Sequence, residues 1–438
     1  MSSSLTLTRT RTRSRSHWLP LEPLHQTPNR GHSFKLPKWP WFHSTMSASL
    51  LYCNHDESIV LLDLPTSIQE AQRSSRRPRS SAPLQRPYPS TEPRGQKRDR
   101  LLASAPLHHL QYHVTLQSQI REALHHIKTH YNSAPWCLPR YCPEVESFDS
   151  IPSPVGRLTL LPTAASQRYS NHVPIVLSPA ANRFSSVASL ENKVVCNGCS
   201  IPTQLSTVEG HTFLVSPSSV LLLSSITAGM PAFTQATTML LAAKVPNVRI
   251  GGFDLLLLDP PWKNRSVRHA QTYRTTENQE GDPFAQTVHV VSDLLAEDGL
   301  VAIWVTNKPT VRAQVMQAYE EIGLHLREEW VWIKTTTQGE PVTQLEGIWR
   351  HPYELCLLFR RTPSQSALKR RIIAAVADLH SRKPSLKTLL ERQLPANYQA
   401  LELFARSLTC GWWSWGSEVL KFQGEHDWEP DCGRPEIH

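Results

Sequence analysis

The chain has 438 residues and a formal net charge of +9, from 46 Lys and Arg against 37 Asp and Glu. A positive balance of this kind favours a polyanionic partner such as nucleic acid, although it specifies no particular sequence. There is no signal peptide and no apolar run of about 18 residues, so we expect an intracellular protein with reduced thiols and no role in a membrane.

The first hundred residues are basic and have little apolar patterning. Residues 8–16 alternate Thr or Ser with Arg, and no acidic residue precedes Glu22. Such a composition cannot bury a core, so we expect residues 1–100 to be largely disordered, with a short ordered segment near 56–70. Met46 lies just before the first patterned stretch and is a candidate for the true initiator.

The basic residues of this region are typical of two kinds of targeting signal. Arg-rich, acid-poor beginnings are typical of mitochondrial transit peptides, whereas the clusters at 73–79 and 94–100 are typical of nuclear import signals. We expect a nuclear protein, with the cytoplasm as a second location and the mitochondrion as the alternative.

Residues 101–235 have the patterning of an N-terminal accessory domain with mixed α+β structure. A helix is expected over 107–130. The residues of its apolar face are Tyr112, Leu116, Ile120, Leu124 and Ile127. The pattern becomes strand-like from 175 to 223, and Asn197-Gly198 predicts a hairpin between a strand at 193–196 and the strand that follows.

Four cysteines in this region invite comparison with a zinc site. Cys196-x-x-Cys199 has ligand spacing, and Cys137 with Cys142 would have to supply the other two ligands. The second pair is more loosely spaced than zinc ligands usually are, and no adjacent His completes the set. We therefore expect no metal.

The strongest chemical signal follows a short apolar strand. Leu255 to Leu258 is wholly apolar and predicts a strand covered on both faces, ending in Asp259-Pro260-Pro261-Trp262. Open α/β sheets bind ligands at this end of their strands. The prolines offer carbonyl acceptors without N–H donors, so Asp259 and the Pro260 carbonyl can hold the hydrogens of an exocyclic amine, while Trp262 stacks on a base. These four residues are the candidate catalytic residues; a capped turn at a strand end is the alternative.

An ordered set of motifs between 245 and 423 extends this interpretation. In chain order they are Asp259-Pro-Pro-Trp262, Ile303-Trp-Val-Thr-Asn307, Glu329-Trp-Val-Trp-Ile-Lys334, His351-Pro-Tyr-Glu354, Arg382-Lys-Pro384, Glu402-Leu-Phe-Ala-Arg406 and Trp412-Trp-Ser-Trp-Gly-Ser-Glu418. The set resembles the eukaryotic adenine N(6)-methyltransferase family named for the seventy-kilodalton subunit of the messenger-RNA enzyme, and within it the methyltransferase-like 4 branch. The resemblance implies an α/β, Rossmann-like, circularly permuted catalytic domain at 236–425, followed by a tail at 426–438.

The resemblance also implies S-adenosyl-L-methionine as the cofactor. Lys383 matches the lysine that pairs with the methionyl carboxylate in the family, and Ser417 departs from the family's usual Asn, with a shorter reach toward the ribose hydroxyls. The full set of implied cofactor-binding residues is Asp259, Lys383, Glu402, Phe404, Arg406, Ser417 and Glu418. Taken singly, each is equally typical of an ordinary surface charge or core residue.

A basic loop after the tetrapeptide is the candidate surface for nucleic acid. Its cations can hold phosphates while Tyr273 packs on an extruded base, because enzymes that modify a base take it out of its stack. The residues assigned to substrate are Lys263, Asn264, Arg265, Arg268 and Tyr273, together with His351 and Glu354 at the pocket rim by family match. A solvated basic loop and a simple turn before a strand at 355–359 are the alternatives.

The other tryptophans are expected in the core. Trp304, Trp330 and Trp332 have the pattern of strand residues in the sheet, and the cluster Trp412, Trp413 and Trp415 is more typical of packing than of base stacking.

Three functions remain open from the sequence. The first is an active adenine methyltransferase acting on RNA, small nuclear RNA among the candidates, or on DNA. The second is a catalytically weak or silent nucleic-acid-binding paralogue, which Ser417 keeps open, and the third is a protein glutamine methyltransferase. We expect the first, because Asp259 suits adenine and the glutamine enzymes usually carry Asn there. The choice between RNA and DNA, and the oligomeric state, are not determined by these motifs.

Overall fold

The computed structural model describes residues 47–133, 135–143, 172–179, 182–242, 252–262, 283–348, 350–363 and 366–430. Contacts group residues 46–438 as one compact unit and residues 1–45 as another. The expectations for residues 1–46, including the candidate initiator Met46 and the transit-peptide alternative, lie outside the described residues.

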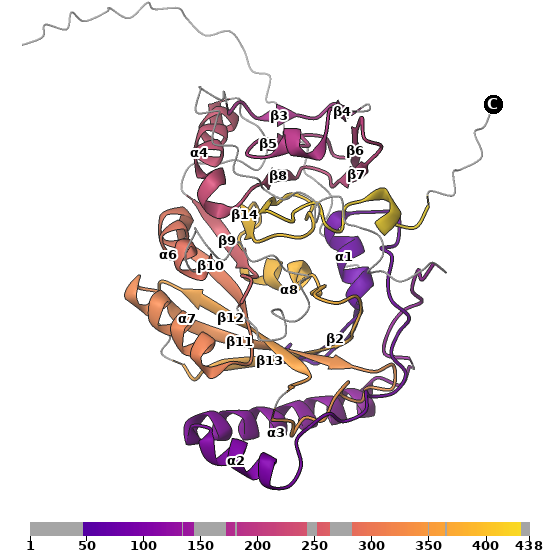
Figure 1. Cartoon of the computed structure of the whole chain (residues 1–438), viewed down its shortest axis with the longest axis vertical. Helices are drawn as coiled ribbons and strands as arrows, with labels where there is room; N and C mark the ends of the chain where they lie inside the picture. The colour runs from indigo at the N-terminus through magenta and orange to yellow at the C-terminus, as the bar shows by residue number, and fades with distance from the viewer. Residues whose placement is uncertain are drawn as a thin grey trace, which may run out of the picture. The chain divides into compact units, whose positions relative to one another are not determined.

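Within the described ranges, a twelve-stranded sheet forms the centre of the larger unit (Figure 1). In spatial order its strands are β1 (Leu50–Cys53), β2 (Ile59–Leu62), β13 (Lys369–Val376), β11 (His325–Thr335), β12 (Tyr353–Arg360), β10 (Leu295–Val305), β9 (Phe253–Leu258), β14 (Ala400–Leu403), β15 (Trp413–Gly416), β8 (Val220–Leu223), β5 (Val194–Cys196) and β3 (Ile175–Val176). β9 pairs in parallel with β10 and β14, and β12 inserts antiparallel between β10 and β11. The mostly parallel sheet confirms the predicted α/β, Rossmann-like class.

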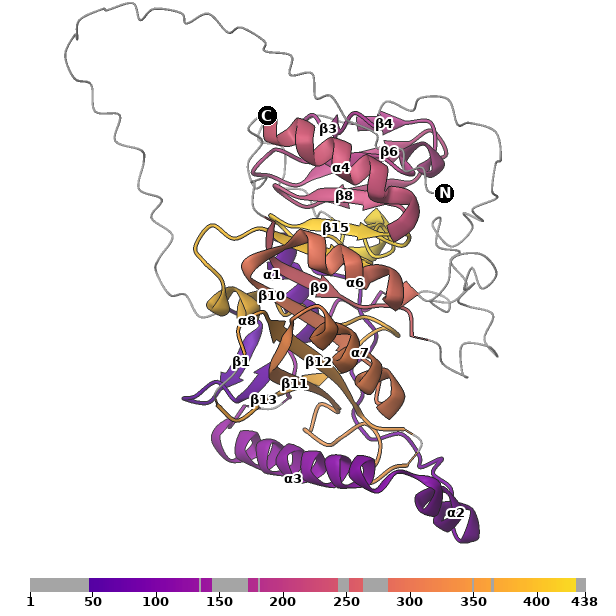
Figure 2. The same ribbon diagram turned by 90° about the vertical axis from the view of Figure 1, so that its left-hand side faces the viewer.

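Each face of the sheet has its own hydrophobic core, because successive strand residues point to opposite faces. Leu256 and Leu258 belong to the face covered by α3 (Leu107–His130), α4 (Ile226–Ala242), α6 (Pro283–Leu294) and α7 (Pro309–Glu321). Leu255 and Leu257 face α1 (Leu64–Gln72) and α8 (Lys387–Leu390). Figure 2 shows α4, α6 and α7 one after another along the first face. The predicted two-sided burial of this strand is therefore confirmed.

The helix predicted over 107–130 is α3. Leu116, Ile120 and Ile127 are fully buried, Leu124 is 6% exposed, and the helix packs on β2 and β13. The shorter α2 (Gln96–Ser104) precedes it and buries none of its residues. The apolar periodicity of α3 thus identified both the helix and the face that it buries.

The tryptophans lie where the sequence pattern placed them. Trp304 is in β10, Trp330 and Trp332 are in β11, and all three are 1–3% exposed. The cluster around β15 is equally buried: Trp412, Trp413 and Trp415 are 1–2% exposed. The prediction that these six rings pack in the core is confirmed.

Residues 47–104 contain more regular structure than the sequence predicted. β1, β2, α1 and α2 all lie in this stretch, and β2 pairs in parallel with β13. Val60, Leu61 and Leu62 of β2 are at most 1% exposed. The ordered segment expected near 56–70 therefore extends on both sides. A four-residue strand that borrows its core from a distant part of the chain leaves almost no mark on the average composition of a hundred residues.

The hairpin predicted at Asn197-Gly198 is wrong. β5 pairs with β8 and β3 in the central sheet, whereas β6 (Thr203–Thr207) pairs with β4 (Asn182–Phe184) and β7 (Thr212–Val215) in a second sheet. Asn197 is fully buried, and its Nδ2 donates to the carbonyls of Ile201, Val215 and Ser216. The side chain therefore ties down a crossing between two sheets instead of forming a two-residue turn. β3, β5 and β8 thus extend the central sheet. The predicted domain boundary near residue 235 stays a prediction.

The described ranges were compared with the requirements of a metal site and of a membrane span. No group of three or more His, Cys, Asp or Glu side chains there is arranged to hold a metal ion. No helix in the same ranges is long and apolar enough to cross a membrane.

Candidate active site

The predicted site residues gather at one edge of the sheet. Asp259 follows β9, Lys383 follows β13, and Arg406 follows β14, and these three strands run in the same direction. Glu354 lies near the start of β12, which begins at this edge because it is antiparallel to its neighbours. β9 lies between β10, the next strand in the chain, and β14, a much later one. Open α/β sheets bind ligands at switch points of this kind.

Asp259 lies between two cations. Its Oδ1 is 3.8 Å from Lys383 Nζ and its Oδ2 is 3.4 Å from Arg406 Nη1. The carboxylate is 17% exposed, and Pro260 behind it is buried. The structure thus brings together one candidate catalytic residue and two candidate cofactor residues that are distant in the sequence.

Glu354 connects two lysines at the same edge. Its Oε1 is 2.6 Å from Lys334 Nζ, and its Oε2 accepts a hydrogen bond from Lys383. Burial alone would raise the pKa of the Glu354 carboxyl, but the charges of Lys383 and Lys334 outweigh it and hold this pKa at about 2. Burial likewise opposes the charge of Lys383, yet Asp259 and Glu354 raise the pKa of its ammonium above the usual value. Glu354 and Lys383 are therefore both charged at neutral pH.

Glu402 is the exception among these charged groups. It lies on β14, where burial above all, and then the charge of Asp259, raises the pKa of its carboxyl to about 8, with Arg406 opposing the shift. In the absence of a ligand this carboxyl is mostly protonated at pH 7. A half-buried acid with a shifted pKa beside a charged cluster is a recurrent property of functional sites.

The turn after β14 has a strained backbone. Phe404 has φ +60°, in the left-handed region that a bulky side chain rarely adopts. At the end of β15, a Cβ on Gly416 would lie 2.5 Å from the Ala405 carbonyl oxygen, so this position accepts only glycine. Strain of this kind persists where the surroundings over-determine the conformation, often beside a ligand site.

Glu418 links the end of β15 to the site. Its Oε2 is 3.4 Å from Arg406 Nε, and its Oε1 is 2.9 Å from Lys421 Nζ. Ser417, one residue earlier, is exposed. The predicted pair therefore splits, with Glu418 joined to the charged cluster and Ser417 facing solvent.

Trp262 is held in place from two sides. Its Nε1 donates to the Trp304 carbonyl at 2.9 Å, and its ring lies 5.4 Å from that of Phe284 in α6. The indole is only partly buried. Stacking of this ring on a base stays a prediction.

His351 lies on the α3 side of the same edge. Its ring stacks on His113 of α3 at 4.3 Å and on Tyr353 at 5.1 Å. Burial lowers the pKa of the His351 imidazole to about 4, so it is neutral at pH 7. A role in substrate binding stays a prediction.

Three neighbours of the site were not assigned to it from the sequence. They are Lys334, which pairs with Glu354; Trp304, whose ring lies 5.1 Å from Lys383 Nζ; and His113, the partner of His351. Lys334 ends one of the sequence motifs and comes directly after the apolar residues 330–333 of β11, so the sequence contained a usable signal. His113 had none, because its partner is far away in the chain. The basic-loop candidates Lys263, Asn264, Arg265, Arg268 and Tyr273 lie outside the described residues.

Comparison with known proteins identifies the family of the chain. The MT-A70 family profile matches residues 253–418, the stretch from β9 to just past β15. The N6-methyladenosine RNA methyltransferase MTA1 of Cryphonectria parasitica is 31% identical over 399 residues, which are 87% of this chain and 94% of that protein. The chain belongs to the MT-A70 family.

Other relatives of this MT-A70 chain match shorter stretches. The N(6)-adenine-specific methyltransferase METTL4 of Mus musculus is 32% identical over 249 residues, 53% of this chain and 48% of that protein. The DNA N6-methyl methyltransferase of Caenorhabditis elegans is 27% identical over 255 residues, 57% of this chain and 64% of that protein. The predicted family and its METTL4 branch are confirmed, and this MT-A70 protein is an enzyme of the methyltransferase class.

Proposed function

We propose that this MT-A70 enzyme transfers the methyl group of S-adenosylmethionine to N6 of adenine in RNA. The observation that carries the proposal is the convergence of Asp259, Lys383 and Arg406 at the carboxyl edge of β9, β13 and β14. RNA is preferred to DNA because the MTA1 relatives, whose similarity extends over 87% of this chain, are named as RNA methyltransferases.

The residues present fit this cofactor. Lys383 is a charged, half-buried ammonium with three donors, so it can bind a carboxylate while keeping Glu354 as a partner. Glu402 offers acceptors for ribose hydroxyls, and the strained turn at Phe404 lies directly after it. When bound, S-adenosylmethionine supplies an electrophilic methyl group on a positively charged sulfur.

Asp259 provides the main electrostatic contribution of the protein to the reaction. Its carboxylate accepts a hydrogen bond from the adenine amine, which returns electron density to N6. As the amine becomes positively charged in the transition state, the same carboxylate stabilises that charge and is placed to take the departing proton. The Pro260 carbonyl holds the second hydrogen, and Trp262 supports the base plane. Positioning and electrostatics therefore supply the catalysis.

The two alternative functions receive less support. A silent paralogue needs neither Asp259 nor a lysine beside it, yet both are in place. The relatives MTA1, METTL4 and the Caenorhabditis elegans protein are all named as adenine methyltransferases, which opposes transfer to glutamine.

Methyl transfer from labelled S-adenosylmethionine to matched RNA and DNA oligonucleotides tests the proposal. After digestion to nucleosides, we expect label in N(6)-methyladenosine, or in its 2′-O-methylated form, from the RNA. Label in DNA alone would transfer the proposal to DNA, and label on protein would remove it.

Glu402 leads to a prediction about pH. Ribose hydroxyls donate to the ionised carboxylate, so binding of the cofactor should favour loss of the Glu402 proton, and affinity should rise with pH through the pKa of about 8. The dissociation constant for S-adenosylmethionine is expected to fall roughly tenfold between about pH 7 and 9. Titration calorimetry across that range measures it. Glu402→Gln should bind more weakly with a flat profile; a wild-type profile as flat as that of the variant would contradict the role.

We further propose that the protein is nuclear and that α2 carries the import signal. Arg79 is 4% exposed and Arg77 pairs with Glu429, so the cluster at 76–79 is engaged within the fold. Arg94, Lys97 and Arg100, in and beside α2, are exposed. Replacing these three by Ala should move a fluorescent fusion of the full chain out of the nucleus, whereas an Arg77→Ala fusion should stay. An unchanged distribution of the triple variant would exclude α2 as the signal.

A further inference from the structure

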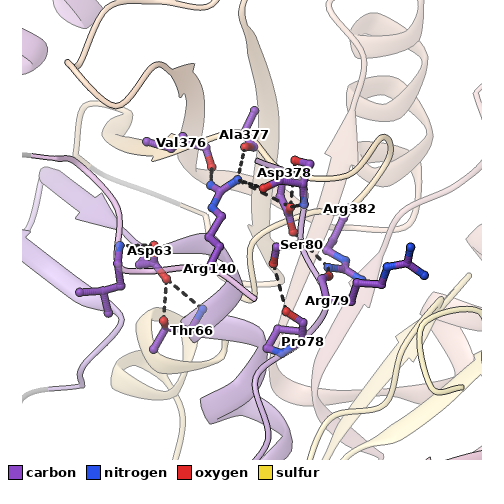
Figure 3. Close-up of polar contacts among 12 residues, drawn as sticks. Asp63, Thr66, Pro78, Arg79, Ser80, Arg140, Val376, Ala377, Asp378 and Arg382 are labelled. Carbon is purple, nitrogen blue, oxygen red and sulfur yellow. Dashed lines mark hydrogen bonds and ion pairs between the residues drawn. The ribbon is translucent and has the colours of Figure 1, made fainter. Parts of the chain in front are cut away.

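A second charged cluster lies behind the candidate site, and almost all of it is buried. It joins the end of β13 to two segments from the first third of the chain, 76–84 and 135–143 (Figure 3). The side chains of Arg140, Asp378 and Arg382 are 0–4% exposed. Charges this deeply buried require partners, so this arrangement is closely constrained.

The guanidinium of Arg140 binds backbone carbonyls at the end of β13. Its Nη2 donates to the Val376 carbonyl at 2.8 Å and its Nη1 to the Ala377 carbonyl at 2.9 Å, 236 and 237 residues away in the chain. Its Nη1 also lies 3.7 Å from Asp378 Oδ1. Figure 3 shows the Arg140 side chain extending from its own segment toward these three residues. A planar guanidinium can make this fork of contacts, which an ammonium cannot.

Asp378 lies between Arg140 and Arg382 and pairs with both. Its Oδ2 is 3.0 Å from Arg382 Nη1, and its Oδ1 accepts from the Ser81 amide at 2.8 Å. Arg382 donates in addition to the Arg79 carbonyl at 2.6 Å and lies 4.6 Å from the centre of the Phe422 ring. The guanidinium is thus fixed on three sides.

Lys383 is the next residue after Arg382, and the turn before it is strained. Ser381 has φ +65°, and its carbonyl accepts from Arg406 Nη1 at 3.3 Å. The Arg382 amide donates to the Leu379 carbonyl at 3.1 Å, which closes the turn. From this turn Lys383 reaches Asp259 and Glu354. The buried cluster therefore defines where the ammonium of Lys383 lies.

We propose that Arg140 is a positioning residue for the cofactor: through Asp378 and Arg382 it fixes the turn that carries Lys383 and so sets the affinity of the enzyme for the carboxylate of S-adenosylmethionine. This inference rests on the proposed function, in which Lys383 binds that carboxylate. The segment 135–143, which precedes the matched family region 253–418, would then help to position the cofactor.

Steady-state kinetics of the full-length Arg140→Met variant test the inference. The KM for S-adenosylmethionine is expected to rise about tenfold or more, because misplacing a positioning group by an ångström can cost ~10²-fold. The kcat at saturating cofactor and the KM for RNA should stay within about twofold, since the reacting residues are intact. Arg140→Lys, which keeps the charge but loses the fork, should lie between wild type and Arg140→Met.

Arg370→Met is the matched control. Arg370 also pairs with a fully buried carboxylate, Glu329, at 2.6 Å, but at the start of β13 instead of its end. It should lower the thermal unfolding midpoint without raising the KM for S-adenosylmethionine. If both variants change stability alone, or if the kcat of Arg140→Met falls in step with its folded fraction, Arg140 is only structural and the inference fails.

Asp378→Asn covers the case in which Arg140→Met does not fold. It keeps the size of the side chain and removes the charge that Arg382 contacts, so it should raise the same KM in the same direction; an unchanged KM would overturn the inference. A wild-type enzyme that binds no S-adenosylmethionine would instead refute the proposed function. The two failures are therefore distinguishable.

Discussion

Asp259→Asn is expected to lower kcat for adenine methylation by roughly 10²- to 10³-fold, because the amide lacks the charge that stabilises the developing positive charge on N6. Size and shape are nearly unchanged, and Lys383 keeps Glu354 as a partner, so the fold should persist. Initial rates with saturating RNA and S-adenosylmethionine measure the effect. Because Asp259 is also among the implied cofactor contacts, titration calorimetry with S-adenosylmethionine is run beside the rates and separates loss of chemistry from loss of cofactor binding.

Asp254→Asn is the control for this variant. Asp254 lies on the same strand, β9, but near its other end, where it accepts a hydrogen bond from the Gln399 amide at 2.7 Å. Its substitution should leave kcat within about twofold, as expected for a residue that does not contact the reacting atoms. If Asp259→Asn kept more than a tenth of the wild-type kcat, Asp259 would not be the acceptor for the amine.

Lys383→Met should weaken the binding of S-adenosylmethionine. Hydrogen bonds to a charged group contribute about 1.5–3 kcal/mol, so the dissociation constant is expected to rise roughly 10- to 100-fold. The fold should tolerate the change, because Glu354 retains Lys334 and Asp259 retains Arg406. Titration calorimetry with the cofactor alone gives this constant without reference to activity.

Lys387→Met is the matched control for the lysine. Lys387 is buried to a similar extent, with 15% of its side chain exposed against 20% for Lys383, but it pairs with Glu391 and Tyr398 instead of Asp259. Its substitution should leave cofactor binding within about twofold, since its partners lie outside the proposed cofactor contacts. Equal losses in both variants would indicate a general effect on this segment and would contradict the assignment of Lys383.

Elements with strong local patterning were predictable from the sequence. The apolar run before Asp259 proved to be β9, and the periodic stretch at 107–130 proved to be α3. Lys383 and Arg406 were assigned by resemblance, and the structure brings both within ion-pair distance of Asp259. For the two elements the decisive signal was local, whereas Lys383 and Arg406 depended on the order of motifs along the catalytic region.

Features that depend on distant partners were not predictable. The two-residue turn expected at Asn197-Gly198 failed because the three carbonyls that the Asn197 side chain contacts come from two later segments. β1 was not predicted, and β2 was expected only as part of a short ordered segment, because the core that buries them is supplied in part by β13 and α3. Glu354 contacts Lys383, a contact that only the antiparallel insertion of β12 creates, while its predicted role at the substrate rim stays a prediction.

The sequence by itself determined that an aspartate and two prolines end a buried strand and that matched lysine and arginine motifs follow, because hydrophobic period, proline stereochemistry and motif order are written in neighbouring residues. Only the tertiary structure decided which charges meet: Asp259 with Lys383 and Arg406, and Arg140 with the end of β13. The physical reason is that an ion pair depends on distance in space, and the order of strands in the sheet, which sets that distance, follows from packing of the whole chain.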